Sequence, residues 1–434
     1  MSKVKLTNVY DLNPWWETGE VPRDLLPSQP RTLFQELRDS LDRRQAEVIV
    51  GLRRTGKTTL MLQLIDHLLR RGTDPRSILY FTFDERSRDL RGLLREYEER
   101  VLRSRLRDRR IYLFLDEVHK LPGWPEEVKL LYDFNPNLKL VLSGSASLNL
   151  MRGAGESLAG RCVFHRLDPL SFVEFLRLRY GESPPPPEDF EISERRLSIH
   201  LQEFLLRGFP EIVRAGDQEA RRYVRELVLE RILYRDIPQS FPASEPELLK
   251  LLAELLCSSP GMVLNVDSLS KELGRAKKTV GDYLSYLELS FVIRRLSNLR
   301  GSMLAVSRKN RKGYPCHPSL CTTQDHTRVI ETLVMSETGA QFYWRLRDLE
   351  VDFVLRNGRT MPVEVKYAQK VRERDLRGIR AFCRRFGLER GLVITREEMG
   401  RLDGLELVPL LRFILYRERL LGGSESGLPG GQTR

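Results

Sequence analysis

The residues best suited to chemistry lie between Val48 and Leu60, where an apolar run leads into the sequence GLRRTGKT. Two glycines let the backbone curl so that its N–H groups point at phosphate oxygens, and the helix expected to follow adds the positive end of its dipole. The lysine would reach the β- and γ-phosphates, and the threonine after it would ligate Mg²⁺. The pattern predicts a site for ATP and Mg²⁺, formed by Gly51, Arg54, Thr55, Gly56, Lys57, Thr58 and Thr59.

A second group of polar residues follows two further apolar runs. Asp116 and Glu117 end the run from Ile111 to Leu115, which is typical of a buried parallel strand. Asp116 is expected to hold Mg²⁺ through water, and Glu117 to orient and activate the attacking water. The next run ends at Ser143 and Ser145, and either hydroxyl could sense the γ-phosphate.

Arg161 is a lone arginine after the short segment Ser157 to Gly160. It could neutralise transition-state charge, in the same subunit or in a neighbouring one. It could equally form a surface salt bridge, and both interpretations stay open.

The elements that position these residues alternate between strand and helix. Apolar runs at 48–50, 78–83, 111–115 and 138–142 predict strands, and the helical patterns at 31–43, 58–69 and 89–106 predict the helices between them. Such alternation predicts an α/β fold with a parallel sheet covered on both faces. The tryptophans Trp15 and Trp16 are expected to pack on the core rather than against adenine.

From Asp168 the pattern becomes helical, with Pro184 to Pro187 as a stiff connector. The helices expected at 171–180, 194–206 and 219–235 are interpreted as the lid of the nucleotide site.

Residues 247–297 have the pattern of a winged helix, with helices at 248–256, 266–273 and 277–289 and then a strand pair. The last helix would enter the DNA major groove, where cations meet phosphates and a hydroxyl or ring meets base edges. Its candidate DNA contacts are Arg275, Lys277, Lys278, Thr279 and Tyr283. A winged helix used only for protein contacts is the alternative.

Taken together, these motifs resemble the archaeal and bacterial AAA-superfamily ATPases that carry a C-terminal winged helix and a restriction-endonuclease-like domain. The resemblance rests on NPWWE from Asn13, GLRRTGKTT from Gly51, LDEVHKLPGW from Leu115, LSGS from Leu142, LAGR from Leu158 and LSFVEF from Leu170. It implies a RecA-like parallel sheet, ATP hydrolysis and, in many members, a role on DNA. It also strengthens Arg161 as a candidate.

The resemblance extends to a second constellation near the C-terminus. Asp352, Glu364 and Lys366 lie on either side of an Asn-Gly turn, with the Asp and Glu-x-Lys spacing of restriction-endonuclease-like nucleases. There, two carboxylates hold Mg²⁺ at the scissile phosphate and the lysine stabilises charge. An upstream acid is expected at Glu331, with Glu337 as the substitute. His317 departs from the family pattern, so cleavage and a silent DNA-binding scaffold remain equal alternatives.

Composition sets the remaining bounds. The chain has 434 residues, a formal charge of +12 and a pI near 9.5, with arginine far more abundant than lysine. The charge favours a polyanionic partner, although genome composition or growth at high temperature would also enrich arginine. We find neither a membrane-spanning run nor a leader pattern, and the five cysteines suit a reducing compartment, so a cytoplasmic location is expected. Cys316, His317, Cys321 and His326 match no common zinc module.

We therefore expect five segments: an ATPase core at 1–167, a helical lid at 168–245, a winged helix at 246–298, a restriction-endonuclease-like α/β domain at 299–421 and a disordered tail at 422–434. The predicted function is Mg²⁺-dependent ATP hydrolysis coupled to DNA binding or remodelling, with a nuclease activity left open. The alternative is a nucleotide-switched signalling or partner-loading ATPase. DNA is the expected partner, no membrane is expected, and homo-oligomerisation stays open.

Overall fold

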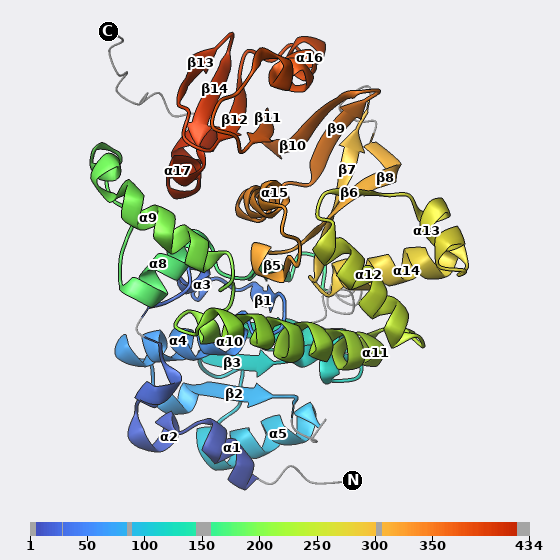
Figure 1. Ribbon diagram of the computed structural model, residues 1–434. Helices are drawn as coiled ribbons and strands as arrows, with labels where there is room; N and C mark the ends of the chain where they lie inside the picture. Colours follow the sequence, from blue (N-terminus) through green and yellow to red (C-terminus); the bar gives the residue numbers. More distant parts are fainter. Residues whose placement is uncertain (1–5, 28, 85–88, 145–157, 301–305, 423–434) are drawn as a thin grey trace.

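A computed structural model describes residues 6–27, 29–84, 89–144, 158–300 and 306–422 (Figure 1). Two sheets organise the described chain, one in the N-terminal part and one in the C-terminal part. The helices of residues 168–289 lie between and beside them (Figure 1).

The N-terminal sheet is parallel and, among the described residues, has five strands in the order β2-β3-β4-β1-β5. Their bounds are Ala46–Val50 (β1), Ile78–Thr82 (β2), Ile111–Asp116 (β3), Leu138–Gly144 (β4) and Cys162–Arg166 (β5). The strands β1, β3 and β4 are buried along their whole length, which is why each reads as a continuous apolar run. The sequence prediction of a parallel α/β core is confirmed.

Helices pack around this sheet (Figure 1). Their bounds are Leu6–Leu12 (α1), Trp15–Thr18 (α2), Leu33–Ser40 (α3), Lys57–Arg70 (α4), Leu90–Glu96 (α5) and Trp124–Phe134 (α6). The indole N–H groups of Trp15 and Trp16 both donate to the carbonyl of Ile78, at 3.2 and 2.8 Å, and Trp16 stacks on Tyr97. Core packing of the two tryptophans is therefore confirmed.

Residues 168–245 are helical, as expected. They contain Phe172–Tyr180 (α8), Phe190–Phe204 (α9), Asp217–Arg222 (α10), the π-helical stretches Tyr223–Leu229 and Ile232–Asp236, and Ile237–Ser240 (α11). From α10 to α11 the chain forms a nearly continuous helical rod (Figure 1). A capping box starts α8, because the Ser171 hydroxyl accepts from the Glu174 N–H while the Glu174 carboxylate accepts from the Ser171 N–H.

Three helices follow, namely Pro246–Ser258 (α12), Val266–Glu272 (α13) and Lys277–Leu289 (α14). They match the three helices expected from the sequence, and α14 has the same bounds as its prediction. The strand Met262–Leu264 (β6), which the sequence reading missed, precedes α13.

The C-terminal sheet has nine strands among the described residues, in the order β13-β14-β12-β11-β10-β9-β7-β8-β6. Its further strands are Ile293–Leu299 (β7), Val306–Pro315 (β8), Phe342–Leu346 (β9), Leu349–Asn357 (β10), Arg359–Lys366 (β11), Gly391–Thr395 (β12), Gly400–Leu402 (β13) and Leu405–Pro409 (β14). Three helices accompany it: His326–Thr338 (α15), Arg377–Phe386 (α16) and Leu410–Gly422 (α17). The hairpin predicted at Asn357 is confirmed, since β10 and β11 pair antiparallel up to Asn357 and Arg359.

One boundary placed from the sequence falls inside an element. We placed the end of the winged helix at residue 298, which lies within β7, and β7 pairs with β8 on one side and with β9 on the other. The strand pair after α14 is therefore continuous with the C-terminal sheet. The tail expected to be disordered, 422–434, lies outside the described residues except for Gly422.

No helix in the described part of the chain combines the length and apolar character needed to span a bilayer.

Candidate functional site

The loop between β1 and α4 is built around two glycines. A Cβ on Gly51 would lie 2.2 Å from the carbonyl oxygen of Leu167, so no larger residue fits there. Gly56 has a φ of 93°, in the left-handed region that favours glycine. The Thr55 hydroxyl donates to the Leu52 carbonyl at 2.9 Å and closes the loop. The loop thus presents its backbone at the carboxyl edge of the sheet and at the amino end of α4, as a phosphate site requires.

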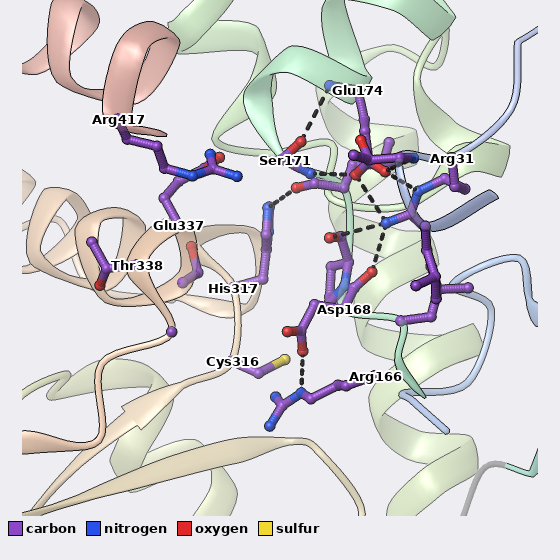
Figure 2. A pocket seen from close by; sticks show the side chains of 17 residues that line it. Arg31, Arg166, Asp168, Ser171, Glu174, Cys316, His317, Glu337, Thr338 and Arg417 are labelled. Atoms are coloured by element: carbon purple, nitrogen blue, oxygen red, sulfur yellow. Dashed lines mark hydrogen bonds and ion pairs between the residues drawn. The ribbon is translucent and has the colours of Figure 1, made fainter. Parts of the chain in front are cut away.

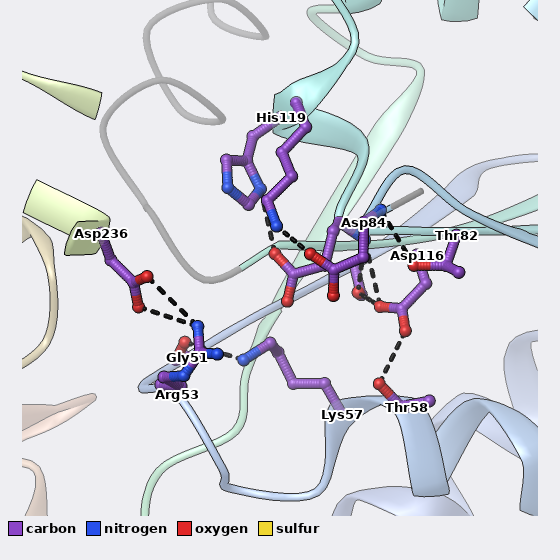
Figure 3. Close-up of polar contacts among 12 residues, drawn as sticks. Gly51, Arg53, Lys57, Thr58, Thr82, Asp84, Asp116, His119 and Asp236 are labelled. Carbon is purple, nitrogen blue, oxygen red and sulfur yellow. Dashed lines mark hydrogen bonds and ion pairs between the residues drawn. The ribbon is translucent and has the colours of Figure 1, made fainter. Parts of the chain in front are cut away.

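Lys57 is buried beneath this loop. Its Nζ donates to the carbonyl of Gly51 at 3.1 Å (Figure 3). It also donates to the carbonyl of Leu52 at 3.0 Å. Burial lowers the pKa of Lys57, and the nearby carboxylates of Glu117 and Asp116 oppose that shift. The loop carbonyls therefore hold the ammonium at the place where phosphate oxygens would compete for it.

Asp116, at the end of β3, accepts hydrogen bonds from three hydroxyls. The Thr58 hydroxyl donates at 2.6 Å, the Tyr80 hydroxyl at 3.0 Å, and Ser143 donates to the other carboxylate oxygen. The carboxylate is buried and fixed in orientation. Ser143 is thus at the site as expected, Ser145 lies outside the described residues, and Tyr80 is a site residue that the sequence reading missed.

This arrangement fits Mg²⁺. The Thr58 hydroxyl and the Asp116 carboxylate are adjacent oxygen donors, and Mg²⁺ is commonly held by one or two protein ligands together with phosphates and water. Among the described residues there is no group of three or more His, Cys, Asp or Glu that could hold a metal ion.

Glu117, the residue after Asp116, has a strained backbone. Its φ is 52°, in the left-handed region, and its N–H donates to Asp116 Oδ1 at 3.1 Å. Burial, together with the negative charge of Asp116, raises the pKa of Glu117 against the opposing charge of Lys57. His119 Nδ1 lies 3.4 Å from Glu117 Oε2, and burial lowers the pKa of His119 to about 4 (Figure 3). A carboxylate with a raised pKa next to a neutral imidazole suits a general base.

The helical segment predicted as a lid contacts the phosphate loop directly. Arg53 pairs with Asp236 at 3.2 Å, and Arg54 pairs with Glu211 at 2.5 Å and lies over the Tyr223 ring. The side chain of Arg54 therefore turns to this segment, so only its backbone stays available to phosphate. Movement of the segment as a lid stays a prediction.

Arg161 lies at the amino ends of the parallel strands, opposite to the phosphate loop at their carboxyl ends. It precedes β5, its carbonyl accepts from the N–H of Ala46 at the start of β1, and its guanidinium pairs with Asp133 at 2.8 Å. The phosphate loop follows the other end of β1. The geometry therefore contradicts a same-subunit role in this conformation and agrees with the surface salt bridge. A role in a neighbouring subunit stays a prediction.

The candidate DNA contacts in and just before α14 differ in their exposure and partners. Arg275 pairs with Glu245 at 2.8 Å and Lys277 with Asp267 at 2.5 Å, while Lys278 is exposed and Thr279 is half-buried. Tyr283 is buried, and its hydroxyl accepts from the N–H of Glu245 at 2.8 Å. Tyr283 is a core residue, and its expected contact with bases is wrong for this conformation.

The C-terminal constellation comes together as its spacing predicts. The register that pairs Phe353 with Val363 sets Asp352 beside Glu364. The N–H of Asp352 donates to Glu364 at 3.2 Å, and Lys366 pairs with Glu364 at 2.7 Å. Burial and the charge of Asp352 raise the pKa of Glu364.

The two upstream acids have separate positions. The Glu331 carboxylate accepts from the Tyr314 hydroxyl at 3.2 Å, and burial and the charge of Asp352 raise its pKa. Glu331 thus belongs to this group. Glu337 points elsewhere, toward the Phe172 N–H and Arg417, so its substitute role is not supported.

A buried lysine from β8 lies among these acids. Lys312 Nζ pairs with Glu350, lies 3.6 Å from Asp352 Oδ1 and lies 5.5 Å from the centre of the Tyr343 ring. Burial opposes its charge, yet the surrounding acids raise the pKa of Lys312 well above its ordinary value. An ammonium thus stands where a metal would need carboxylate oxygens, and these residues do not fit Mg²⁺ as they are arranged. The sequence reading did not predict this contact, because no local spacing links Lys312 on β8 to Asp352 on β10, and β8 joins this sheet through β7 and β9.

Comparison with known families identifies the N-terminal part. Residues 43–176 match a family described as an AAA domain, so the chain carries a P-loop ATPase domain of the AAA superfamily. Residues 199–328 and 327–413 match two families described only as domains of unknown function.

Related whole proteins are uncharacterized. One from Methanocaldococcus jannaschii is 24% identical over 358 residues, 79% of each chain. One from Haemophilus influenzae is 27% identical over 60% of this chain and 64% of its own, and a second from M. jannaschii is 26% identical over 62% and 60%. The chain thus spans less than two thirds of the latter two relatives.

Among solved structures, a Walker-type ATPase of Pyrococcus abyssi is similar over 68% of this chain and 98% of its own, with 16% identity and a TM-score of 0.38. PCH-2 of C. elegans is similar over 45% and 46%, with 16% identity and a TM-score of 0.23. Both scores are low, so neither likeness says what this chain does.

Proposed function

We propose that this chain hydrolyses ATP with Mg²⁺ at the phosphate loop and couples hydrolysis to DNA binding. The observation that supports hydrolysis most is the contact of Thr58 with Asp116 beside Glu117, at the mouth of a loop that holds Lys57. These groups supply a phosphate cradle, a cation site and a base, which are the parts that phosphoryl transfer needs.

In the proposed mechanism the chain does little covalent chemistry. The loop N–H groups and Lys57 bind the β- and γ-phosphates, with Lys57 exchanging its two loop carbonyls for phosphate oxygens. Thr58 and Asp116 would hold Mg²⁺, which would neutralise phosphate charge when bound. Glu117 orients the attacking water and accepts its proton, and its raised pKa makes it a better acceptor than an ordinary carboxylate.

Coupling to DNA is supported by charge and exposure. The helices α13 and α14 with the hairpin β7–β8 are interpreted as a winged helix, and exposed Arg275, Lys277 and Lys278 gather at the amino end of α14. A net charge of +12 adds long-range attraction to phosphate backbones.

For the C-terminal domain we propose binding without cleavage. The adjacency of Asp352, Glu364 and Lys366 favours cleavage as a second candidate. Lys312 argues against it, because its ammonium pairs with Glu350 and lies 3.6 Å from Asp352, one of the two carboxylates that a metal would need. A domain with this arrangement would recognise DNA or another macromolecule without metal chemistry.

The competing proposal is a nucleotide-switched signalling or partner-loading ATPase, in which homo-oligomerisation follows the nucleotide state. Arg53 pairs with Asp236 and Arg54 with Glu211, both in the helical segment predicted as a lid. These contacts support the competing proposal, because a change in the phosphate loop would directly affect that segment.

One experiment separates the two. Mg²⁺-ATP hydrolysis is measured with single-stranded, duplex and branched DNA at two salt concentrations, for the wild type and Lys57→Ala. Stimulation by one DNA form that weakens with salt and is absent in the variant supports DNA coupling. The competing proposal is supported if no DNA form stimulates hydrolysis and the oligomeric state changes with the bound nucleotide.

A further inference from the structure

A buried ion pair that none of the proposed site residues belongs to contacts the phosphate loop. Arg31, just before α3, pairs with Glu174 of α8, and both side chains are less than a tenth exposed (Figure 2). Arg31 Nε and Nη2 donate to the two Glu174 carboxylate oxygens at 2.9 and 3.0 Å. The third nitrogen, Nη1, donates to the carbonyl oxygen of Thr55 at 2.6 Å. One guanidinium thus joins α8 to the phosphate loop.

The contact with Thr55 fixes the orientation of one peptide unit of the loop. The carbonyl of Thr55 and the N–H of Gly56 belong to one peptide unit, and in a trans peptide the two groups point in opposite directions. Arg31 directs this carbonyl toward the Arg31–Glu174 pair. The Gly56 N–H therefore points the opposite way, toward the side on which we expect the loop N–H groups to receive phosphate.

We propose that Arg31 is a positioning residue for nucleotide binding, which sets the orientation of the Thr55–Gly56 peptide through its contact with the Thr55 carbonyl. This rests on the proposed ATP site, and Arg31 itself touches no nucleotide. The opposite orientation would turn the Thr55 carbonyl toward the phosphates, where its oxygen would repel them.

The position of Arg31 is itself determined on several sides. Its Nη2 also donates to the Asp168 carbonyl at 2.8 Å, and Glu174 accepts from the N–H of Thr32 at 2.8 Å. Charge and hydrogen bonds from Arg31 outweigh burial and lower the pKa of Glu174 to about 2, so Glu174 stays ionised at neutral pH. A guanidinium with this many fixed partners has one orientation.

The amino end of α8 also contacts the C-terminal domain. Glu337 of α15 accepts from the N–H of Phe172 at 2.8 Å, in the first turn of α8. Arg31, Glu174 and Glu337 line one cavity of about 350 Å³, bounded by both the ATPase core and the C-terminal domain (Figure 2). The residue that orients the phosphate loop therefore lies on the contact between these two parts.

The test uses Arg31→Lys in the full chain. A lysine keeps the positive charge beside Glu174, but its single ammonium cannot also reproduce the fork that reaches Thr55. Two quantities are measured: the Kd of a fluorescent ADP derivative, and KM and kcat for ATP. Arg91→Ala is the matched control, because it removes an arginine that pairs with Glu127 on the surface of the same domain. The Tm of each protein shows that it is folded.

We expect Arg31→Lys to weaken ADP binding and to raise KM at least tenfold, with kcat nearly unchanged because Lys57, Asp116 and Glu117 remain. Arg91→Ala should bind as the wild type does. A folded Arg31→Lys that binds ADP like the wild type overturns the inference, as does an equal loss in both variants. Arg31→Ala should show a larger loss, and if it does not fold, Arg31→Lys alone decides. A wild type that binds no nucleotide would instead overturn the proposed function.

Discussion

The hydroxyl of Thr58 donates to the carboxylate of Asp116 across 2.6 Å, joining the first turn of α4 to the end of β3. These residues are 58 positions apart in the sequence. The contact brings the phosphate loop together with Glu117, which follows Asp116 directly.

Glu117→Gln should stop hydrolysis while ATP still binds. The amide keeps the size of the side chain but cannot accept a proton, so turnover should fall by about 10²- to 10⁴-fold. Single-turnover hydrolysis and ATP binding are measured side by side, with Glu126→Gln as the control because Glu126 is an exposed acid on nearby α6. Since burial raises the pKa of Glu117, wild-type turnover should decline on acidification at a higher pH than an ordinary glutamate would give. Unchanged turnover in Glu117→Gln would remove it from this role.

Lys278→Ala should change DNA binding, whereas Tyr283→Phe should change stability. Lys278 is exposed, so its removal should weaken binding to all DNA sequences and reduce the slope of log K against log salt by about 1. Tyr283 is buried, so losing its hydroxyl should leave DNA binding intact and cost about 1 kcal/mol of unfolding free energy. DNA titration and urea denaturation of both variants check this. Loss of DNA binding in a fully stable Tyr283→Phe would restore Tyr283 as a DNA contact.

Lys312→Met should create a metal site. The substitution removes the ammonium that pairs with Glu350 and lies near Asp352, although Glu350 keeps Arg345 at 3.5 Å. Mn²⁺ binding without nucleotide should therefore strengthen at least tenfold, roughly 1.4 kcal/mol. Adding Asp352→Ala to this variant should abolish the gain, which calorimetry would detect. Mn²⁺-dependent DNA cleavage by the wild type that disappears in Asp352→Ala would show that Lys312 does not block the site.

Glu174→Gln should destabilise the protein and flatten its acid unfolding. The pKa of Glu174 is about 2 in the folded chain against an ordinary 4.5, a difference worth about 3 kcal/mol. Because the folded pKa is depressed, this stabilisation is complete above pH 4.5 and is lost as the pH falls toward 2. Urea unfolding between pH 7 and pH 3 measures it, with the exposed Glu191→Gln as control. Equal pH dependence in Glu174→Gln and the wild type would contradict the linkage.

The sequence was most informative where one short segment contains the whole signal. The phosphate loop, the acids after β3 and the bounds of α14 follow from local spacing and apolar periodicity. Tyr283 could also have been placed correctly, because Val280, Tyr283, Leu284 and Leu287 follow the spacing of a buried helix face.

Contacts between distant segments gave no such signal. Arg31 and Glu174 are 143 positions apart, and nothing local distinguishes Arg31 from the many other arginines. Lys312 reaches Asp352 only because β8 joins the C-terminal sheet through β7 and β9, a pairing that periodicity does not specify. The sequence suggested a catalytic role for Arg161. Because Arg161 directly precedes β5, however, it lies at the amino ends of the parallel strands, away from the phosphate loop.

The unbroken sheet from β6 to β13 also determines how the chain can be divided. A truncation near residue 298 would leave β9 without its β7 neighbour and expose a row of unpaired backbone groups, a surface prone to aggregation. Expression of the C-terminal part alone therefore calls for a fragment that begins before α12, so that the helices and the nine strands are made together.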